Sequence, residues 1–244
     1  MLYAVFYAIQ AAVAVALPII FLVKYNKKQN VKKSYAKGGA AVFFIFGAAA
    51  NALLSLYITG NFSPSSPFVQ NLWLSAVVSA VINTICVLLG KTLWVKFVIK
   101  EANSKHDAVT FGAGYATCFM VLSYALSATV SVVFALLNSF ANNPEISEIL
   151  RGTYDIYASS TYYRIFLVTI QCVLLGACEL FLTVTLFGGV KKKINPLVTF
   201  SAVVLSFGIY FVPYIPLNLE INLVILAVIT LLSAYTAYIT YKEL

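Results

Sequence analysis

Glu179 is the residue of this sequence whose position most suggests chemistry. It lies in the apolar run VLLGACELFLTV, 15 residues after Arg164 and 12 residues before Lys191. In a helix, that places the carboxyl group roughly 18–22 Å from either charged end. A carboxyl group at such depth in a membrane is costly and normally faces the bundle interior or a wet cavity. Glu179 therefore contacts an ion, proton or substrate, or acts as a catalytic carboxylate, unless it is a protonated Glu that joins helices through one hydrogen bond.

Partners for Glu179 are expected among neutral polar groups, because no Lys or Arg is predicted at its depth. The candidates are the amide of Asn83 and the hydroxyls of Ser123 and Ser127. Two further amides, Asn51 and Gln171, also fall within apolar runs. Such amides more often join helices than bind ligands.

Metal-ligating residues are sparse. The single His, His106, lies beside Asp107 in a basic segment, and the sequence has neither an HExxH element nor a Cys pair at metal spacing. All four Cys residues lie inside apolar runs, where a thiol usually serves as a small packing group. No phosphate-binding glycine loop or Ser/His/Asp set is present. We therefore predict no catalytic residue, no metal site and no cofactor.

The elements that must position Glu179 are membrane-spanning helices. The chain is 61% hydrophobic and 10% charged, with a mean hydropathy of +0.92, whereas soluble domains hold about 25% charged residues. Apolar runs of ~20 residues are long enough to cross the hydrocarbon core as helices. The sequence predicts one all-α transmembrane domain over 1–244 with an outer loop at 138–163. The seven expected helices are about 2–23, 38–59, 71–90, 108–137, 164–190, 196–212 and 217–241.

The distribution of Lys predicts the orientation. Of the 16 basic residues, all the lysines fall in alternate gaps between apolar runs, with Lys91 assigned to the second of these gaps. Short cytoplasmic loops are enriched in Lys and Arg, so we expect the N-terminus outside and the C-terminus in the cytoplasm. The lysines would contact anionic lipid headgroups rather than nucleic acid, in a multi-pass, bacterial plasma-membrane protein. The expected headgroup and topology residues are Lys27, Lys28, Lys32, Lys33, Lys191, Lys192 and Lys193.

Two segments outside the expected spans have local patterns. After Gly90, the sequence KTLWVKFVIKEANSK predicts either a helix lying along the membrane surface or an extension of the preceding span. In the outer loop, Asn143-Pro144-Glu145 predicts a short helix ending at Arg151. The tyrosines that follow are expected to form an interfacial aromatic belt or a partner surface: Tyr154, Tyr157, Tyr162 and Tyr163.

The order of these features resembles the YhfC-type intramembrane metalloproteases, which are related to the PrsW and CAAX-protease group. The shared features are seven helices, a Lys-rich gap leading into KGGAAVFFIFGA, the turn after the third helix, a Gly-rich start of the fourth and an acidic residue in the fifth. The family pattern has an acidic pair followed by Arg near the end of the third helix. Here Gly90-Lys91 stands at the acidic pair and Trp94 near the Arg.

The fourth helix departs from the pattern as well. The family has a GxGHGxxE-like element there, and further Glu and His residues on later helices. In GAGYATCF, Gly112 and Gly114 remain, but Tyr115 replaces the His and Phe119 the Glu. Glu179 is the acidic element that remains. The resemblance therefore implies a pseudoenzyme that keeps the fold and has lost the metal site.

Three functions stay open. The first is a non-catalytic membrane scaffold or a subunit that binds a membrane-protein partner, and the missing ligands favour it. The second is a small-solute or ion transporter or channel with Glu179 in the pathway, although the sequence shows no internal repeat of the kind such proteins often have. The third is an active intramembrane protease that uses Glu179 with an unrecognised set of ligands.

Overall fold

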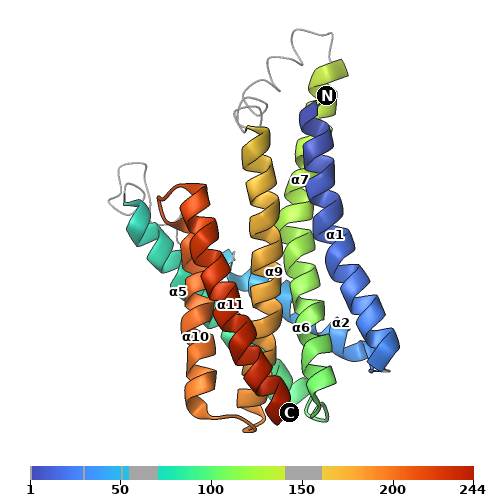
Figure 1. Cartoon of the computed structure of the whole chain (residues 1–244), viewed down its shortest axis with the longest axis vertical. Helices are drawn as coiled ribbons and strands as arrows, with labels where there is room; N and C mark the ends of the chain where they lie inside the picture. Colours follow the sequence, from blue (N-terminus) through green and yellow to red (C-terminus); the bar gives the residue numbers. More distant parts are fainter. Residues whose placement is uncertain (1, 30, 51, 55–70, 141–160) are drawn as a thin grey trace.

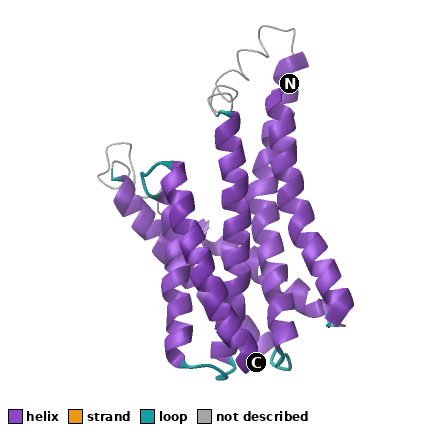
Figure 2. Cartoon of the chain, in the orientation of Figure 1, coloured by secondary structure: helices purple, strands orange, loops and turns teal. Residues whose placement is uncertain are grey.

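The prediction of an all-α bundle is confirmed by a computed structural model of the chain, which describes residues 2–29, 31–50, 52–54, 71–140 and 161–244. Every regular element in these residues is helical (Figure 2). Seven helices within them are long and apolar enough to cross a membrane. The chain is thus a multi-pass membrane protein, as the sequence predicts.

The spans begin and end as follows. The first is α1 (Leu2–Gln29), and the second is α2 (Lys33–Val42), which continues through a π-helical turn, η1 (Phe43–Gly47), to Leu54. The third is α5 (Leu72–Leu93) with the π turn η2 (Trp94–Val98). The fourth comprises α6 (Lys105–Met120), the π turn η3 (Val121–Ala125) and α7 (Leu126–Phe140). The last three are α9 (Tyr162–Val190), α10 (Pro196–Phe211) with the 3₁₀ turn η4 (Val212–Tyr214), and α11 (Leu219–Glu243).

Several helices start at capping residues that the sequence supplies. Asn71 accepts a hydrogen bond from the backbone N–H of Leu74, and Thr161 accepts one from that of Arg164. Ser104 and Asp107 form a reciprocal capping box at the start of α6. Because the first N–H groups of a helix have no partner within it, these side chains fix where each span begins.

Helix α9 is the central element of the bundle (Figure 1). It packs against α1, α5, α6, α10 and α11. Half of the residues in its most apolar stretch are buried, a larger share than in any of the other six spans. A polar side chain in the middle of α9 is therefore enclosed by protein and shielded from lipid.

Helices α2 and α6 cross at very short distance. A Cβ atom added at Gly39 would lie 2.0 Å from the carbonyl oxygen of Phe111, and one added at Gly114 would lie 2.0 Å from that of Ala36. Only glycine leaves room for such a backbone approach, which is common between membrane helices. This contact holds the start of α6 against α2.

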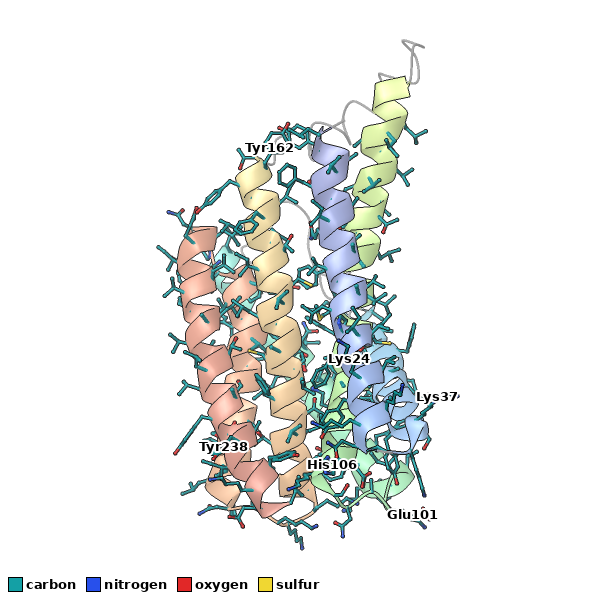
Figure 3. The ribbon with its side chains drawn as sticks, turned by 45° about the vertical axis from the view of Figure 1, so that its right-hand side comes forward. Lys24, Lys37, Glu101, His106, Tyr162 and Tyr238 are labelled. Atoms are coloured by element: carbon teal, nitrogen blue, oxygen red, sulfur yellow. The ribbon has the colours of Figure 1, made fainter. Side chains whose placement is uncertain are left out.

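The lysine-rich gaps meet at one end of the bundle, which we call the basic end. The Nζ atoms of Lys191 and Lys193 donate hydrogen bonds of 2.8 Å to the backbone carbonyls of Lys100 and Asn103, and Lys32 lies 3.7 Å from Glu101. The C-terminus lies at this end and the N-terminus at the other (Figure 1). Figure 3 shows Lys37, Glu101 and His106 at the basic end and Tyr162 far from it. That the basic end faces the cytoplasm remains a prediction.

Some expected features lie outside the described residues: the amide of Asn51, the short helix at Pro144–Arg151, and Tyr154 and Tyr157. Of the remaining outer-loop tyrosines, Tyr162 stacks on Tyr3 with ring centroids 4.4 Å apart. Tyr163 is 57% exposed.

Candidate functional site

Glu179 lies on the inward face of α9 and is 1% exposed. Its neighbours on that face, Leu175, Leu182 and Thr183, are also buried. The hydroxyl of Thr183 donates a 2.5 Å hydrogen bond to the backbone carbonyl of Glu179. This carboxyl group is therefore removed from both lipid and water, and it requires a partner within the protein.

That partner is a lysine. The Nζ atom of Lys91 lies 2.5 Å from Oε2 of Glu179, and the Lys91 side chain is 2% exposed. The expectation that no cation reaches the depth of Glu179 is wrong, and so is the assignment of Lys91 to a basic loop. The physical reason is that α5 continues past Gly90 to Leu93, so Lys91 lies on the inward face of a helix.

Two tyrosines complete the site. The Tyr210 hydroxyl donates a hydrogen bond to Oε1 of Glu179. The ring of Tyr115 lies beneath the Lys91 ammonium, with Nζ 3.9 Å from the ring centroid. The two tyrosine hydroxyl oxygens are 3.5 Å apart. Lys91, Tyr115, Glu179 and Tyr210, here called the buried quartet, come from α5, α6, α9 and α10, respectively.

The charges within the quartet balance each other. One positive and one negative charge are in contact, so the site has no net charge when both are ionised. Each Glu179 oxygen already accepts a bond from Lys91 or Tyr210. The negative face of the Tyr115 ring further stabilises the ammonium. In a low-dielectric interior such contacts are strong, and removing one partner would leave the other charge uncompensated.

The structure separates the other expected polar candidates from Glu179. The amide nitrogen of Asn83 donates to the Ser79 carbonyl within its own helix, at 2.9 Å. Gln171 lies eight residues before Glu179 on α9, in the wall of a pocket that also contains Arg164. Among the described residues, the hydrogen bonds to the two Glu179 carboxyl oxygens come from Lys91 and Tyr210, so the expected pairing with Asn83, Ser123 or Ser127 is wrong.

The sequence motifs indicate Tyr115 as a candidate site residue, but they do not indicate Lys91 or Tyr210 as one. A signal for Lys91 does exist in the sequence. Residues spaced three or four positions apart form one stripe along a helix, and Lys91 follows Val87 at the next turn of such a stripe. The stripe consists of Ala76, Ala80, Thr84, Val87 and Lys91. Tyr210 has no comparable signal, because α10 is apolar almost throughout.

Metal-ligating groups do not gather in the described part of the chain. No three His, Cys, Asp or Glu side chains there are placed to hold an ion. His106 lies at the basic end, where its Nδ1 is 2.9 Å from the Tyr25 hydroxyl. The four cysteines are free thiols. Cys178 forms a hydrogen bond with Thr230, and its Sγ lies 3.1 Å from the Thr230 hydroxyl oxygen.

The lysines expected at lipid headgroups lie at the basic end. Lys27, Lys28, Lys32, Lys33 and Lys192 are exposed, while Lys191 and Lys193 are half-buried. Partial burial lowers the pKa of Lys191, and the neighbouring charge of Lys193 lowers it further. Contact with lipid remains a prediction for all of them.

Comparison with known proteins places these features in a family. The model of the YhfC intramembrane metalloprotease family matches residues 13–215. The membrane protein YhfC of Bacillus subtilis (strain 168), described as uncharacterized, is 24% identical over 131 residues. That alignment covers 54% of this chain and 51% of the relative, so the chain spans about half the length of that protein. No solved structure matches. Since the family model covers most of the chain, including Lys91, Tyr115, Glu179 and Tyr210, this protein belongs to the YhfC intramembrane metalloprotease family.

Proposed function

We propose that this protein is a non-catalytic member of its family: a membrane scaffold, or a subunit that binds a membrane-protein partner. The observation that supports this most directly is the Lys91–Glu179 ion pair at the centre of the bundle. A lysine ammonium next to the deeply buried Glu179 carboxylate provides the positive charge that a metal ion would otherwise provide.

The residues present do not fit a catalytic metal. A catalytic zinc site normally uses three protein ligands from His, Cys or carboxylate groups, plus an open position for water. The quartet has one carboxylate, and both of its oxygens already accept hydrogen bonds. An ammonium 2.5 Å from Oε2 also repels a second cation from that oxygen.

The resemblance to the family pattern supports the same conclusion. Lys91 stands at the acidic pair of that pattern and Tyr115 at its His, and both contact each other in the quartet. Two positions that would supply ligands thus supply a cation and an aromatic ring. Lys91 and Tyr115 thus have a structural role at these positions, because they contact each other and Lys91 also pairs with Glu179.

A partner role is proposed because the described residues include no sizeable domain outside the membrane spans. Whatever the protein recognises would then contact helix faces or short loops. Its apolar faces are suited to other transmembrane segments, which pack through small residues and interhelical hydrogen bonds.

The test is purification of the tagged protein from its native host in a gentle detergent, followed by metal analysis and mass spectrometry on the same sample. We expect no stoichiometric metal and one co-purifying membrane protein at a fixed ratio. About one equivalent of zinc that a chelator removes would overturn the proposal.

Transport is the second candidate, favoured by the chain of Lys, Glu and Tyr groups within the bilayer. Ionisable residues at such depth often lie on ion or proton pathways. Proteoliposomes loaded with a pH-sensitive dye test this directly. Proton flux in the native protein that is lost in Tyr210→Phe would favour transport. A proton flux equal to that of empty liposomes would exclude proton transport by this protein.

A further inference from the structure

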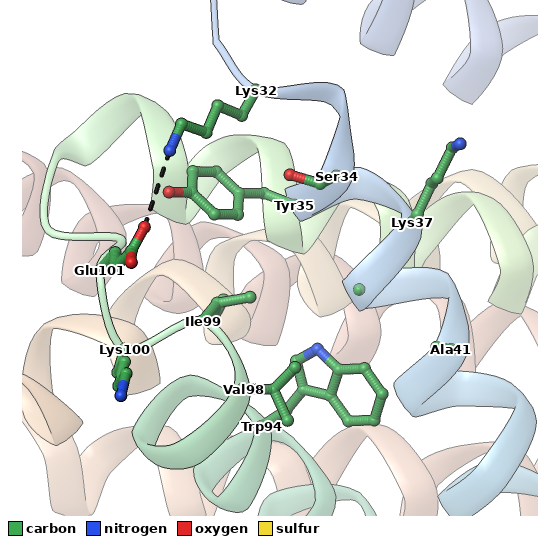
Figure 4. A pocket seen from close by; sticks show the side chains of 11 residues that line it. Lys32, Ser34, Tyr35, Lys37, Ala41, Trp94, Val98, Ile99, Lys100 and Glu101 are labelled. Carbon is green, nitrogen blue, oxygen red and sulfur yellow. Dashed lines mark ion pairs between the residues drawn. The ribbon is translucent and has the colours of Figure 1, made fainter.

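We propose that a pocket at the basic end binds the phosphate headgroup of an anionic phospholipid. The pocket has a volume of about 510 Å³ and lies between the start of α2 and the segment that follows α5 (Figure 4). This proposal is independent of the buried quartet, which contributes no residue to the pocket. The lysines at this end are expected to contact lipid in general, whereas this pocket would bind one phosphate headgroup at a defined place.

The walls of this site, the headgroup pocket, come from two segments far apart in the sequence. The start of α2 contributes one wall and the turn η2 with the residues after it the other. The lining residues from the first segment are Lys32, Ser34, Tyr35, Lys37, Gly38 and Ala41. Those from the second are Trp94, Val98, Ile99, Lys100 and Glu101.

The charge in the headgroup pocket favours an anion. Three lysines line it against one carboxylate. Glu101 lies 3.7 Å from Lys32, and both side chains are largely exposed, so their attraction is weak. Lys37 and Lys100 remain as cations on opposite walls (Figure 4). In that view both ammonium groups point away from the middle of the pocket, so each flexible side chain would turn inward to contact a phosphate.

Hydrogen-bond donors in the same walls are available. Helix α2 starts without a side-chain cap, because Lys32 occupies the N-cap position. Its first backbone N–H groups and the Ser34 hydroxyl therefore suit an acceptor. Trp94 adds a second, independent observation: its Nε1 is buried and has no hydrogen-bond partner among the described residues.

The position of Trp94 explains the glycine that faces it. A Cβ atom added at Gly38 would lie 2.8 Å from Nε1 of Trp94. A side chain there would push the indole aside, whereas glycine lets α2 pack directly against the indole N–H at the wall of the pocket. A buried donor without a partner is unfavourable by about 1–3 kcal/mol, so an acceptor that reaches the N–H would stabilise the folded protein.

Apolar surface beside the pocket favours a lipid over a free anion. Val98 is 58% exposed and the preceding Phe97 is 63% exposed, both at the end of a membrane span. Acyl chains would lie along these side chains while the phosphate enters the pocket. An aromatic ring with a polar N–H at such a boundary suits the headgroup region.

Trp94 itself can report binding, because the sequence has only one other tryptophan, Trp73. In the full chain carrying Trp73→Phe, purified in a neutral detergent, the emission of Trp94 is followed during titration with short-chain phosphatidylglycerol. We expect a saturable shift in emission. Phosphatidylcholine, the matched neutral-headgroup lipid, should give none.

Charge variants then locate the site. Lys37→Gln/Lys100→Gln should weaken phosphatidylglycerol binding by about tenfold or more. The control Lys28→Gln/Lys192→Gln removes two exposed lysines from the same end outside the pocket, and should change affinity by less than about threefold. Equal loss in both double variants would show diffuse attraction and overturn the proposal.

Two further measurements separate the remaining outcomes. Inorganic phosphate that produces the same shift at similar concentration would identify a free-anion site and overturn the lipid assignment. The Gly38→Ala variant should weaken phosphatidylglycerol binding while its circular dichroism spectrum stays helical. Unchanged affinity in a helical Gly38→Ala protein would overturn the assignment of this pocket.

Discussion

Lys91 and Glu179, 88 positions apart in the chain, form a direct ion pair of 2.5 Å between Nζ and Oε2 inside the helix bundle. Neither side chain reaches water or lipid, with exposures of 2% and 1%. Buried ion pairs add little net stability over apolar packing, but breaking one partner leaves an uncompensated charge. The pair therefore makes α5 and α9 mutually dependent.

The first prediction concerns this dependence. Glu179→Gln should lower the free energy of unfolding by about 3–5 kcal/mol, because the Lys91 ammonium loses its counter-charge. Lys91→Met should do the same by stranding the carboxylate. The double variant Lys91→Met/Glu179→Gln should recover most of the loss. Unfolding in mixed micelles measures all three, and strictly additive losses would show that the two side chains are not coupled.

The second prediction separates the two tyrosines. Tyr210→Phe removes a hydrogen bond to a buried carboxylate and should destabilise the protein by about 1.5–3 kcal/mol. Tyr115→Phe keeps the ring under Lys91 and should change stability less, whereas Tyr115→Leu removes the ring. Thermal unfolding of the purified variants gives the order. A larger loss for Tyr115→Phe than for Tyr115→Leu would contradict the cation–π contact.

The third prediction tests the crossing of α2 and α6. Gly39→Ala and Gly114→Ala each place a methyl group 2.0 Å from a backbone carbonyl oxygen, so the helices must separate. Each should destabilise the fold severely, by more than ~3 kcal/mol.

Gly208→Ala is the control for this pair, because its added Cβ would lie 3.1 Å from a side-chain methyl of Ile229 that can move. Yield and thermal stability in detergent give the comparison. Similar behaviour of Gly114→Ala and Gly208→Ala would mean that α2 and α6 do not approach as described.

The fourth prediction tests the proposed loss of the metal site by reversing it. Lys91→Glu/Tyr115→His would place a carboxylate and an imidazole beside Glu179, which is the ligand number of a catalytic zinc site. We expect the purified double variant to gain zinc, measured as metal per protein after dialysis. Lys91→Glu/Tyr115→Phe lacks the imidazole and should not. Equal zinc content in the two double variants would contradict the assignment of Tyr115 to the position of the metal-binding His in the family pattern.

The fifth prediction fixes the orientation. In a background without the four native cysteines, Lys192→Cys should react with a membrane-impermeant maleimide only after cells are opened. Tyr163→Cys, near the opposite end of α9, should react in intact cells. This follows from the enrichment of lysine in cytoplasmic loops. The reverse labelling pattern would place the basic end outside.

The sequence by itself determined the seven spans, the all-α class and the family. Apolar runs of membrane-spanning length and lysines in alternate gaps are local properties, so they can be read without knowing which helices touch. The cost of burying a carboxylate likewise identified Glu179 as a residue that needs a partner. Resemblance to the family pattern added Tyr115.

Only the tertiary structure decided what that partner is. An expected helix end one residue before Lys91 placed this lysine in a basic gap, while α5 in fact continues to Leu93. Which helix faces α9, and at what rotation, depends on packing among spans distant in sequence, and the Tyr210 hydroxyl reaches Glu179 only because α10 packs there. The spans follow from transfer of each segment into lipid, whereas the quartet follows from contacts among four helices that no single segment encodes.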